Sequence, residues 1–214
     1  FVPSCSNRNS YGSSAFAENI AINSVNQNAN AVFNLALGVN PVLVGTALAL
    51  PRLWDAVMDP WIGSMSDHCR SRWGRRRPFI LVGAILTALC TAGIWFFPLG
   101  HSPMFYFGWL AGGSFLLATA YSVFVVPYGA LGLELTRDYH ERTRLMGTKS
   151  MLHKSSGVVN QWLLKLVLWA GNNNLVAGSR ICGVVLGFIV AALGAVTVWR
   201  VPERLPAAPA AGPR

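Results

Sequence analysis

Three ionisable side chains lie in a segment that otherwise has the composition of a membrane-spanning helix: Arg52, Asp55 and Asp59. Charge at that depth is costly, so a functional role is the first hypothesis. Separations of three and four residues place all three on one helical face, at ~100° per residue. Two carboxylates one turn apart beside a guanidinium form a candidate cation site, at which H⁺ or Na⁺ is the expected ion.

Pro60 directly follows Asp59 and lacks a backbone N–H, which frees the carbonyl oxygen of Ala56. A free carbonyl beside two carboxylates is an additional oxygen ligand for a hard cation such as Na⁺. A simple proline kink explains Pro60 equally well, so both interpretations stay open.

The elements around these residues are apolar. The chain is 53% hydrophobic and 12% charged, against ~25% charged in soluble proteins. Runs of ~20 apolar residues are long enough to cross a ~30 Å hydrocarbon core. We predict an all-α integral membrane protein with six transmembrane helices, at about residues 15–37, 42–65, 78–98, 104–133, 149–170 and 176–199.

The basic residues indicate the topology. They cluster between the second and third spans, between the fourth and fifth, and after the sixth, whereas the opposite loops are nearly bare. This pattern predicts a protein of the cell (inner) membrane with both ends in the cytoplasm. The predicted parts are a cytoplasmic segment at 1–14, a six-helix unit at 15–199 and a cytoplasmic Pro/Ala-rich linker or tail at 200–214. The net charge of +9 therefore indicates topology and membrane-lipid contact, not nucleic acid.

The first predicted span carries an unusual stripe of carboxamides. Asn19, Asn23, Asn26 and Asn30 are spaced four, three and four residues apart and share a helical face, with Glu18 beside them. Facing a water-filled cavity, these amides can bind the hydroxyl groups of a solute. Alternatively, they hydrogen-bond to neighbouring helices and hold the bundle together.

Further polar residues in the later spans can reach the same cavity. Tyr121, Ser122 and Tyr128 interrupt the apolar fourth span, although aromatic rings also fill helix interfaces, and Lys149 at the start of the fifth span can instead snorkel to the cytoplasmic surface. The candidate substrate-binding residues are Glu18, Asn19, Asn23, Asn26, Arg52, Tyr121, Ser122, Tyr128 and Lys149.

Both basic cytoplasmic loops combine acids with clustered arginines, which predicts a cytoplasmic gate closed by carboxylate–guanidinium pairs. A pure topology signal is the alternative, but orientation does not require the acids. The candidate gate residues are Asp67, Arg70, Arg75, Arg76 and Arg77 in the first loop, and Glu134, Asp138 and Arg142 around the second.

Two stretches resemble a known family, the glycoside-pentoside-hexuronide:cation symporters of the major facilitator superfamily. The first stretch is Arg52-x-Trp54-Asp55-Ala56-x-x-Asp59-Pro60-x-x-Gly63, continuing to Ser66-Asp67 and the run from Arg70 to Pro78. The second is Pro127-Tyr128-x-Ala130-Leu131-x-x-Glu134-Leu135-Thr136-x-Asp138-Tyr139-x-Glu141-Arg142-Thr143. The resemblance extends from about residue 11 to 199.

The resemblance implies a twelve-helix transporter with alternating access, of which this chain is similar to the amino-terminal half, a 3+3 inverted repeat. It also implies that Asp55 and Asp59 bind the coupling cation. Family members that carry melibiose have aspartates where this chain has Asn19 and Val125. The loss of both argues against melibiose as the substrate. A family arginine that contacts sugar aligns with Lys149 or Ser150.

We therefore expect a secondary active transporter that couples H⁺ or Na⁺ to symport of a sugar or glycoside, with no other cofactor. Its partners are a small-molecule sugar, the cation, membrane lipid and a missing carboxy-terminal half. The alternative is a truncated, non-transporting membrane protein, or a half-transporter that needs a partner half. An enzyme is not expected, because no nucleophile and base pair, metal-ligand cluster or phosphate loop stands out.

Overall fold

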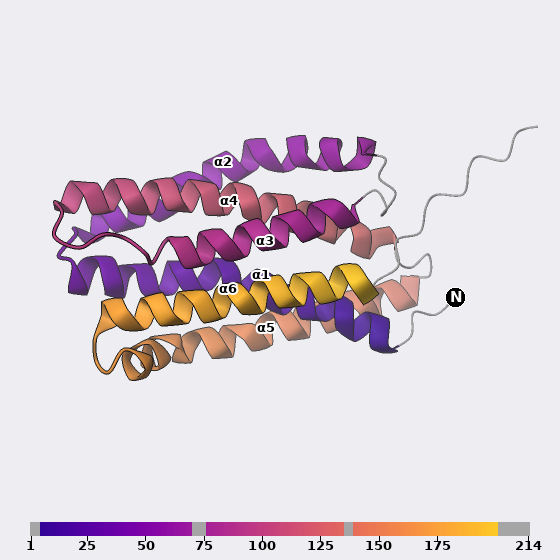
Figure 1. Cartoon of the computed structure of the whole chain (residues 1–214). Coiled ribbons are helices and arrows are strands. Elements are labelled where there is room, and N and C mark those ends of the chain that lie inside the picture. The colour runs from indigo at the N-terminus through magenta and orange to yellow at the C-terminus, as the bar shows by residue number, and fades with distance from the viewer. Residues whose placement is uncertain (1–4, 70–75, 135–138, 201–214) are drawn as a thin grey trace, which may run out of the picture.

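The computed structural model describes the backbone of residues 5–69, 76–134 and 139–200, and the side chains of 13–69, 76–132 and 140–200. Within these ranges the secondary structure is entirely helical, and the helices lie side by side in one elongated bundle (Figure 1). The elements are α1 (Cys5–Ala29), η1 (Asn30–Ala36), α2 (Pro41–His68), α3 (Arg77–Gly93), α4 (Pro103–Glu134), α5 (Tyr139–Ala170) and α6 (Leu175–Arg200).

The helix ends follow local chemistry. The Asn40 side chain accepts a hydrogen bond from the Val42 backbone N–H at 2.9 Å, which caps α2. Asn174 caps α6 in the same way, through Val176 at 3.1 Å. Gly38 has φ 68°, a conformation glycine adopts without steric cost, and this turns the chain between η1 and α2.

Some helices extend beyond the predicted spans. The first helix begins at Cys5 and the fifth at Tyr139, about ten residues before the predicted starts. Helical hydrogen bonding continues through polar residues outside an apolar span, so the apolar run underestimates the helix. In contrast, α3 ends at Gly93, before the predicted 98, because the backbone turns at Ile94 and Trp95.

Three helices are long and apolar enough to cross a membrane by themselves: Pro41–His68, Pro103–Gly132 and Leu175–Arg200. The apolar helix Arg77–Gly93 is shorter. The first and fifth helices fall outside this set because the amide stripe and the basic residues dilute their apolar character. The all-α prediction is thus confirmed for the described residues, whereas composition and length alone support three of the six predicted spans.

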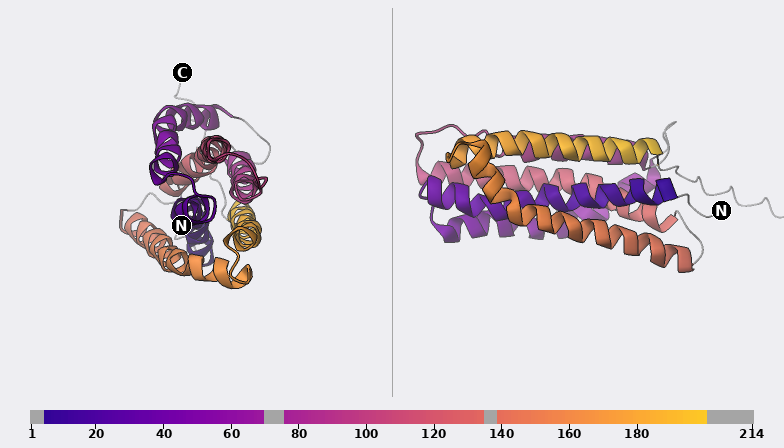
Figure 2. Two further views of the ribbon diagram at one scale, coloured as in Figure 1. Left: turned by 90° about the vertical axis from the view of Figure 1, so that its left-hand side faces the viewer. Right: turned by 90° about the horizontal axis from the view of Figure 1, so that it is seen from below.

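The packing order places α1 inside the bundle. It contacts α5 and α6 extensively, and α3 and α4 to a lesser extent, and the end-on view in Figure 2 shows it surrounded by other helices. The remaining principal pairs are α2 with α4, α3 with α4 and α3 with α6. A polar helix in this position must direct its amides toward neighbouring helices or toward cavities between them.

Glycines allow the closest helix crossings. A Cβ on Gly83 of α3 would lie 2.5 Å from the backbone nitrogen of Phe124 in α4. A Cβ on Gly187 of α6 would lie 2.7 Å from the Ala88 carbonyl oxygen. Such contacts between backbones are typical of helix packing in membranes, where van der Waals attraction replaces the hydrophobic effect.

Candidate functional site

The charged residues of α2 border a hollow between α1, α2 and α4. Arg52 and Asp55 line this α2 hollow, which has a volume of about 220 Å³. Asp55 is partly buried, and Arg52 and Asp59 are exposed. Asp59 lies one helical turn from Asp55 on α2 and does not line the hollow. The structure therefore brings the two carboxylates together on α2, with Asp55 alone reaching the hollow.

Two polar atoms in the α2 hollow lack partners within the described part of the chain. They are Oδ1 of Asp55 and the hydroxyl oxygen of Ser114, both buried. The Ser122 hydroxyl lies beside the Asp55 carboxylate as well and is itself buried. Buried oxygens without partners are costly, and hard cations bind carboxylate and other oxygen ligands. The α2 hollow therefore presents oxygen atoms of the kind that hard cations take as ligands.

Glu18 of α1 links three helices. Its Oε1 accepts a hydrogen bond from the Tyr121 hydroxyl at 3.4 Å, and its Oε2 lies 3.6 Å from Nζ of Lys149 in α5. The Lys149 ammonium also lies over the Tyr128 ring, 4.8 Å from its centroid. The structure thus brings these four predicted residues together, but it buries Tyr128 completely within a core cluster, where it packs rather than lines a hollow.

Asn19 hydrogen-bonds to α5 through both the nitrogen and the oxygen of its side-chain amide. Its Nδ2 lies 2.7 Å from Nε2 of His153, and its Oδ1 accepts a hydrogen bond from Nδ2 of Asn160 at 3.2 Å. Sequence reasoning missed His153 and Asn160. A signal was present, because Lys149, His153, Ser156 and Asn160 repeat the four-three-four spacing that singled out the first helix.

A second hollow, of about 400 Å³, lies between α1 and α5. We call it the α5 hollow. Its polar lining residues are Asn19, Asn23, Gln27, His153, Lys154, Asn160 and Gln161. Asn23 also lines the α2 hollow, together with Asn26. The predicted amide stripe therefore divides: Asn23 and Asn26 face hollows, Asn30 is exposed, and Asn19 is buried in contact with α5.

One predicted gate pair is present at the end of α2. The Asp67 Oδ1 accepts hydrogen bonds from Nη2 of Arg76 at 2.7 Å and from Nε at 3.2 Å. Arg76 is buried, Arg77 is partly buried and Arg142 is exposed. Arg70, Arg75 and Asp138 lie outside the described residues, as does the side chain of Glu134.

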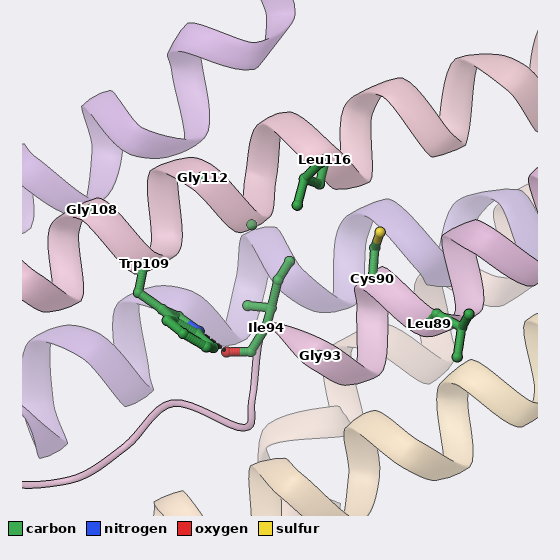
Figure 3. Close-up of a pocket in the computed structure, with 9 residues that line it drawn as sticks. Leu89, Cys90, Gly93, Ile94, Gly108, Trp109, Gly112 and Leu116 are labelled. Atoms are coloured by element: carbon green, nitrogen blue, oxygen red, sulfur yellow. Dashed lines mark hydrogen bonds between the residues drawn. The ribbon is translucent and has the colours of Figure 1, made fainter.

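A further cavity, larger than both hollows, is apolar and lies elsewhere. It occupies about 530 Å³ between α3 and α4, lined by Leu89, Cys90, Gly93, Ile94, Gly108, Trp109, Gly112, Gly113 and Leu116 (Figure 3). The indole N–H of Trp109 donates to the Ile94 carbonyl at 3.1 Å. Among the described residues, no carboxylate or amide side chain lines this cavity.

The chain matches the MFS/sugar transport protein family over residues 10–210. An uncharacterized symporter of Synechocystis sp. is 39% identical over 116 residues, covering 50% of this chain and 21% of that protein. The inner membrane symporter YicJ of Escherichia coli is 30% identical over 175 residues, covering 80% and 37%. The isoprimeverose transporter of Lactiplantibacillus pentosus is 34% identical over 89 residues, covering 40% and 19%.

The chain covers between 19% and 37% of the length of these relatives. The matched range includes both stretches that carry the resemblance to cation symporters, and relatives named as symporters and sugar transporters confirm that resemblance. The family contains transporters and not enzymes. Together with the family match, the long apolar helices of this chain identify it as an integral membrane protein. The chain belongs to the MFS/sugar transport protein family.

Proposed function

We propose that the chain is the amino-terminal half of a secondary active transporter that carries a sugar or glycoside together with H⁺ or Na⁺. The observation that carries the proposal is the Asp55 carboxylate, which presents a buried oxygen without a partner among the described residues. It does so in a hollow beside Asp59 and Arg52, in a chain of a sugar-transport family.

The packing order supports a 3+3 inverted repeat. If α1, α2 and α3 are exchanged with α4, α5 and α6, the α1–α5 pair becomes the α4–α2 pair. Likewise the α3–α4 pair becomes α6–α1, and the α3–α6 pair maps onto itself. Two equivalent three-helix units explain these relations. Under this proposal all six helices span the membrane, including the more polar α1, which other helices surround, and α5, whose exposed face would meet the carboxy-terminal half.

The orientation follows from charge. Arg76, Arg77, Arg142 and Arg144 lie at the ends of helices on one side of the bundle, and the positive-inside rule places that side in the cytoplasm together with both termini. A relative is named as an inner membrane symporter, which supports the same membrane for this chain. The carboxy-terminal half would then cover the exposed faces of α2 and α5, where Trp61 is 63% exposed and Trp162 58%.

The coupling mechanism uses the α2 hollow. A cation that binds at Asp55 and Asp59 cancels the repulsion between the two carboxylates, and this favours the conformation that moves both ligands across the membrane. One charge crossing ~100 mV is worth ~2.3 kcal/mol, enough for roughly fifty-fold accumulation of a neutral solute. Asp67 and Arg76 would close the cytoplasmic side until the ligands are released.

The solute is a carbohydrate under this proposal. Relatives are named as an isoprimeverose transporter and a glucuronide carrier homologue, and the carboxamides at the hollows suit hydroxyl groups. The residue at the position of the second family acid, Val125, packs against a core cluster. The cation site therefore depends on the α2 acids more than in relatives with an acid there.

The test is uptake of radiolabelled carbohydrates into proteoliposomes that hold the complete transporter containing this chain, driven by an imposed Na⁺ or H⁺ gradient. Asp59→Asn should abolish gradient-driven uptake. Glu141→Gln removes an acid of similar size outside the hollows and serves as the control. Unchanged uptake by Asp59→Asn refutes the proposed cation site.

A further inference from the structure

One face of α5 carries exposed side chains that no other described helix covers. Val158, Trp162, Lys165 and Trp169 follow one another at separations of four, three and four residues, so they share one side of the helix. All four are exposed, and we call them the α5 stripe. The opposite side of α5 packs against α1, and the end-on view in Figure 2 places α5 at the edge of the bundle.

Lys165 is the only charged residue of α5 between positions 155 and 170. Its Nζ lies over the Trp162 ring, 4.4 Å from the centroid. Under the proposed orientation α5 runs outward and Trp162 lies deeper than Lys165, so the ammonium is directed toward the middle of the membrane, as the lean of helical side chains favours. Snorkelling to the outer surface would require the opposite direction. Charged groups at this depth typically pair with one another.

The chain offers no acid for this pairing. Within its described part Lys165 forms no ion pair. Glu18 is paired with Lys149, which lies ~24 Å from Lys165 along α5 at 1.5 Å per residue. Asp55 and Asp59 belong to α2, whereas the main contacts of α5 are with α1 and α6. The other five of the eight acids flank the basic cytoplasmic segments in the sequence. A partner for Lys165 must therefore come from outside this chain.

The exposed faces of α3 and α6 have a different composition. Exposed side chains there include Leu89 and Phe188, and no charged residue occurs at 78–93 or 181–199, so these faces suit lipid chains. The α5 stripe instead combines an ammonium with two indoles, which are enriched where proteins meet. Most of the length of each curated relative lies outside the match to this chain. A carboxy-terminal half is thus the occupant that can supply a carboxylate.

We infer that the α5 stripe docks on a helix of the carboxy-terminal half that carries an aspartate or glutamate at the level of Lys165, and that the two side chains form an ion pair between the halves. Trp162 and Trp169 flank the pair along α5 and exclude lipid from it. The ammonium is already held over the Trp162 ring, so little side-chain freedom is lost on pairing. The inference rests on the proposed function, because it requires the complete transporter.

Charge exchange in the complete transporter identifies the partner. The probes are glucose, galactose, xylose, sucrose, lactose and melibiose, and uptake into proteoliposomes is measured for each that the wild type transports. Lys165→Glu brings two carboxylates together and should lower uptake by at least about tenfold, whereas the control Lys165→Arg should retain it. Each Asp and Glu is then replaced by Lys in the Lys165→Glu background. One replacement beyond residue 214 should restore uptake, although the same replacement alone impairs it.

The Tm of each protein in detergent, followed by tryptophan fluorescence, should fall and recover in the same variants. Rescue by a lysine at one of the eight acids within residues 1–214 would assign the partner to this chain or to a second copy of it, and overturns the inference. Unchanged uptake by Lys165→Glu, or the absence of any rescuing replacement, overturns it as well.

Lys165→Met distinguishes a protein carboxylate from a lipid phosphate. The ratio of wild-type to Lys165→Met uptake should be the same in vesicles of phosphatidylcholine alone and in vesicles that also contain phosphatidylglycerol. A ratio near one in phosphatidylcholine alone assigns the ammonium to anionic lipid and overturns the inference. If the wild type transports none of the probes while Tm shows the charge exchange, the proposed function fails and the ion pair stands. If neither is seen, both fail.

Discussion

The pair formed by Glu18 and Lys149 gives the most quantitative prediction. The carboxylate is 11% exposed and the lysine side chain 23% exposed, with 3.6 Å between Oε2 and Nζ. Lys149→Met removes the positive charge and leaves Glu18 with the long hydrogen bond from Tyr121 within the described part of the chain. A buried carboxylate without a counter-charge is strongly destabilising.

A fully buried pair broken on one side costs about 3–5 kcal/mol. The separation here is longer than a direct hydrogen bond and Lys149 retains some solvent contact, so we expect about 2–3 kcal/mol. In a chain of 214 residues, 1 kcal/mol shifts Tm by about 2–4 °C. The predicted loss is therefore about 4–12 °C.

The assay is thermal unfolding in detergent, followed by the fluorescence of the eight tryptophans. Lys154→Met, which removes an exposed lysine from the same helix, is the matched control and should leave Tm unchanged. Combining Lys149→Met with Glu18→Gln should recover most of the loss, because no uncompensated charge then remains. The reasoning is refuted if Lys149→Met has the same Tm as the wild type, or if the double variant has a Tm no higher than that of Lys149→Met.

Further predictions concern the helix crossing and the gate. Gly83→Ala places a methyl group 2.5 Å from the Phe124 backbone and should destabilise the bundle by about 1–3 kcal/mol. In the control variant Gly112→Ala, the new methyl group meets nothing within 4 Å, so Tm should not change. Equal Tm values for the two variants would contradict the α3–α4 crossing. Arg76→Gln removes the charge from both hydrogen bonds to Asp67. The equilibrium constant for opening of the proposed gate should rise about ten- to hundredfold. Alkylation of Cys69 by a membrane-impermeant maleimide, quantified by mass spectrometry, should accelerate accordingly, and an unchanged rate contradicts the gate.

Local pattern predicted most of the helices and the cluster of acids. The predicted second span, 42–65, falls within α2, and the four-residue spacing of Asp55 and Asp59 is enough to place both on one face of that helix. These features depend on neighbours along the chain, and helical periodicity converts them directly into positions.

Features that depend on contacts between helices were less predictable. The amide stripe indicated two uses, and only the position of α5 against α1 shows that Asn19 bonds to His153 and Asn160 while Asn23 faces both hollows. Ser114 reaches the α2 hollow because α4 packs against α2, and a lone serine in an apolar helix carries no periodic signal. For Tyr128 the sequence left both a cavity and a helix interface open, and the packing of the helices buries it in an interface.

Cation movement during solute transport tests the central claim most directly. In proteoliposomes with the complete transporter and no imposed ion gradient, addition of a transported carbohydrate should drive influx of H⁺ or Na⁺, recorded by a pH-sensitive dye or by ²²Na⁺. Asp55→Asn and Asp59→Asn should abolish this influx, because the proposed cation site depends on both carboxylates of α2. Carbohydrate uptake by the wild type without movement of either cation would contradict the account.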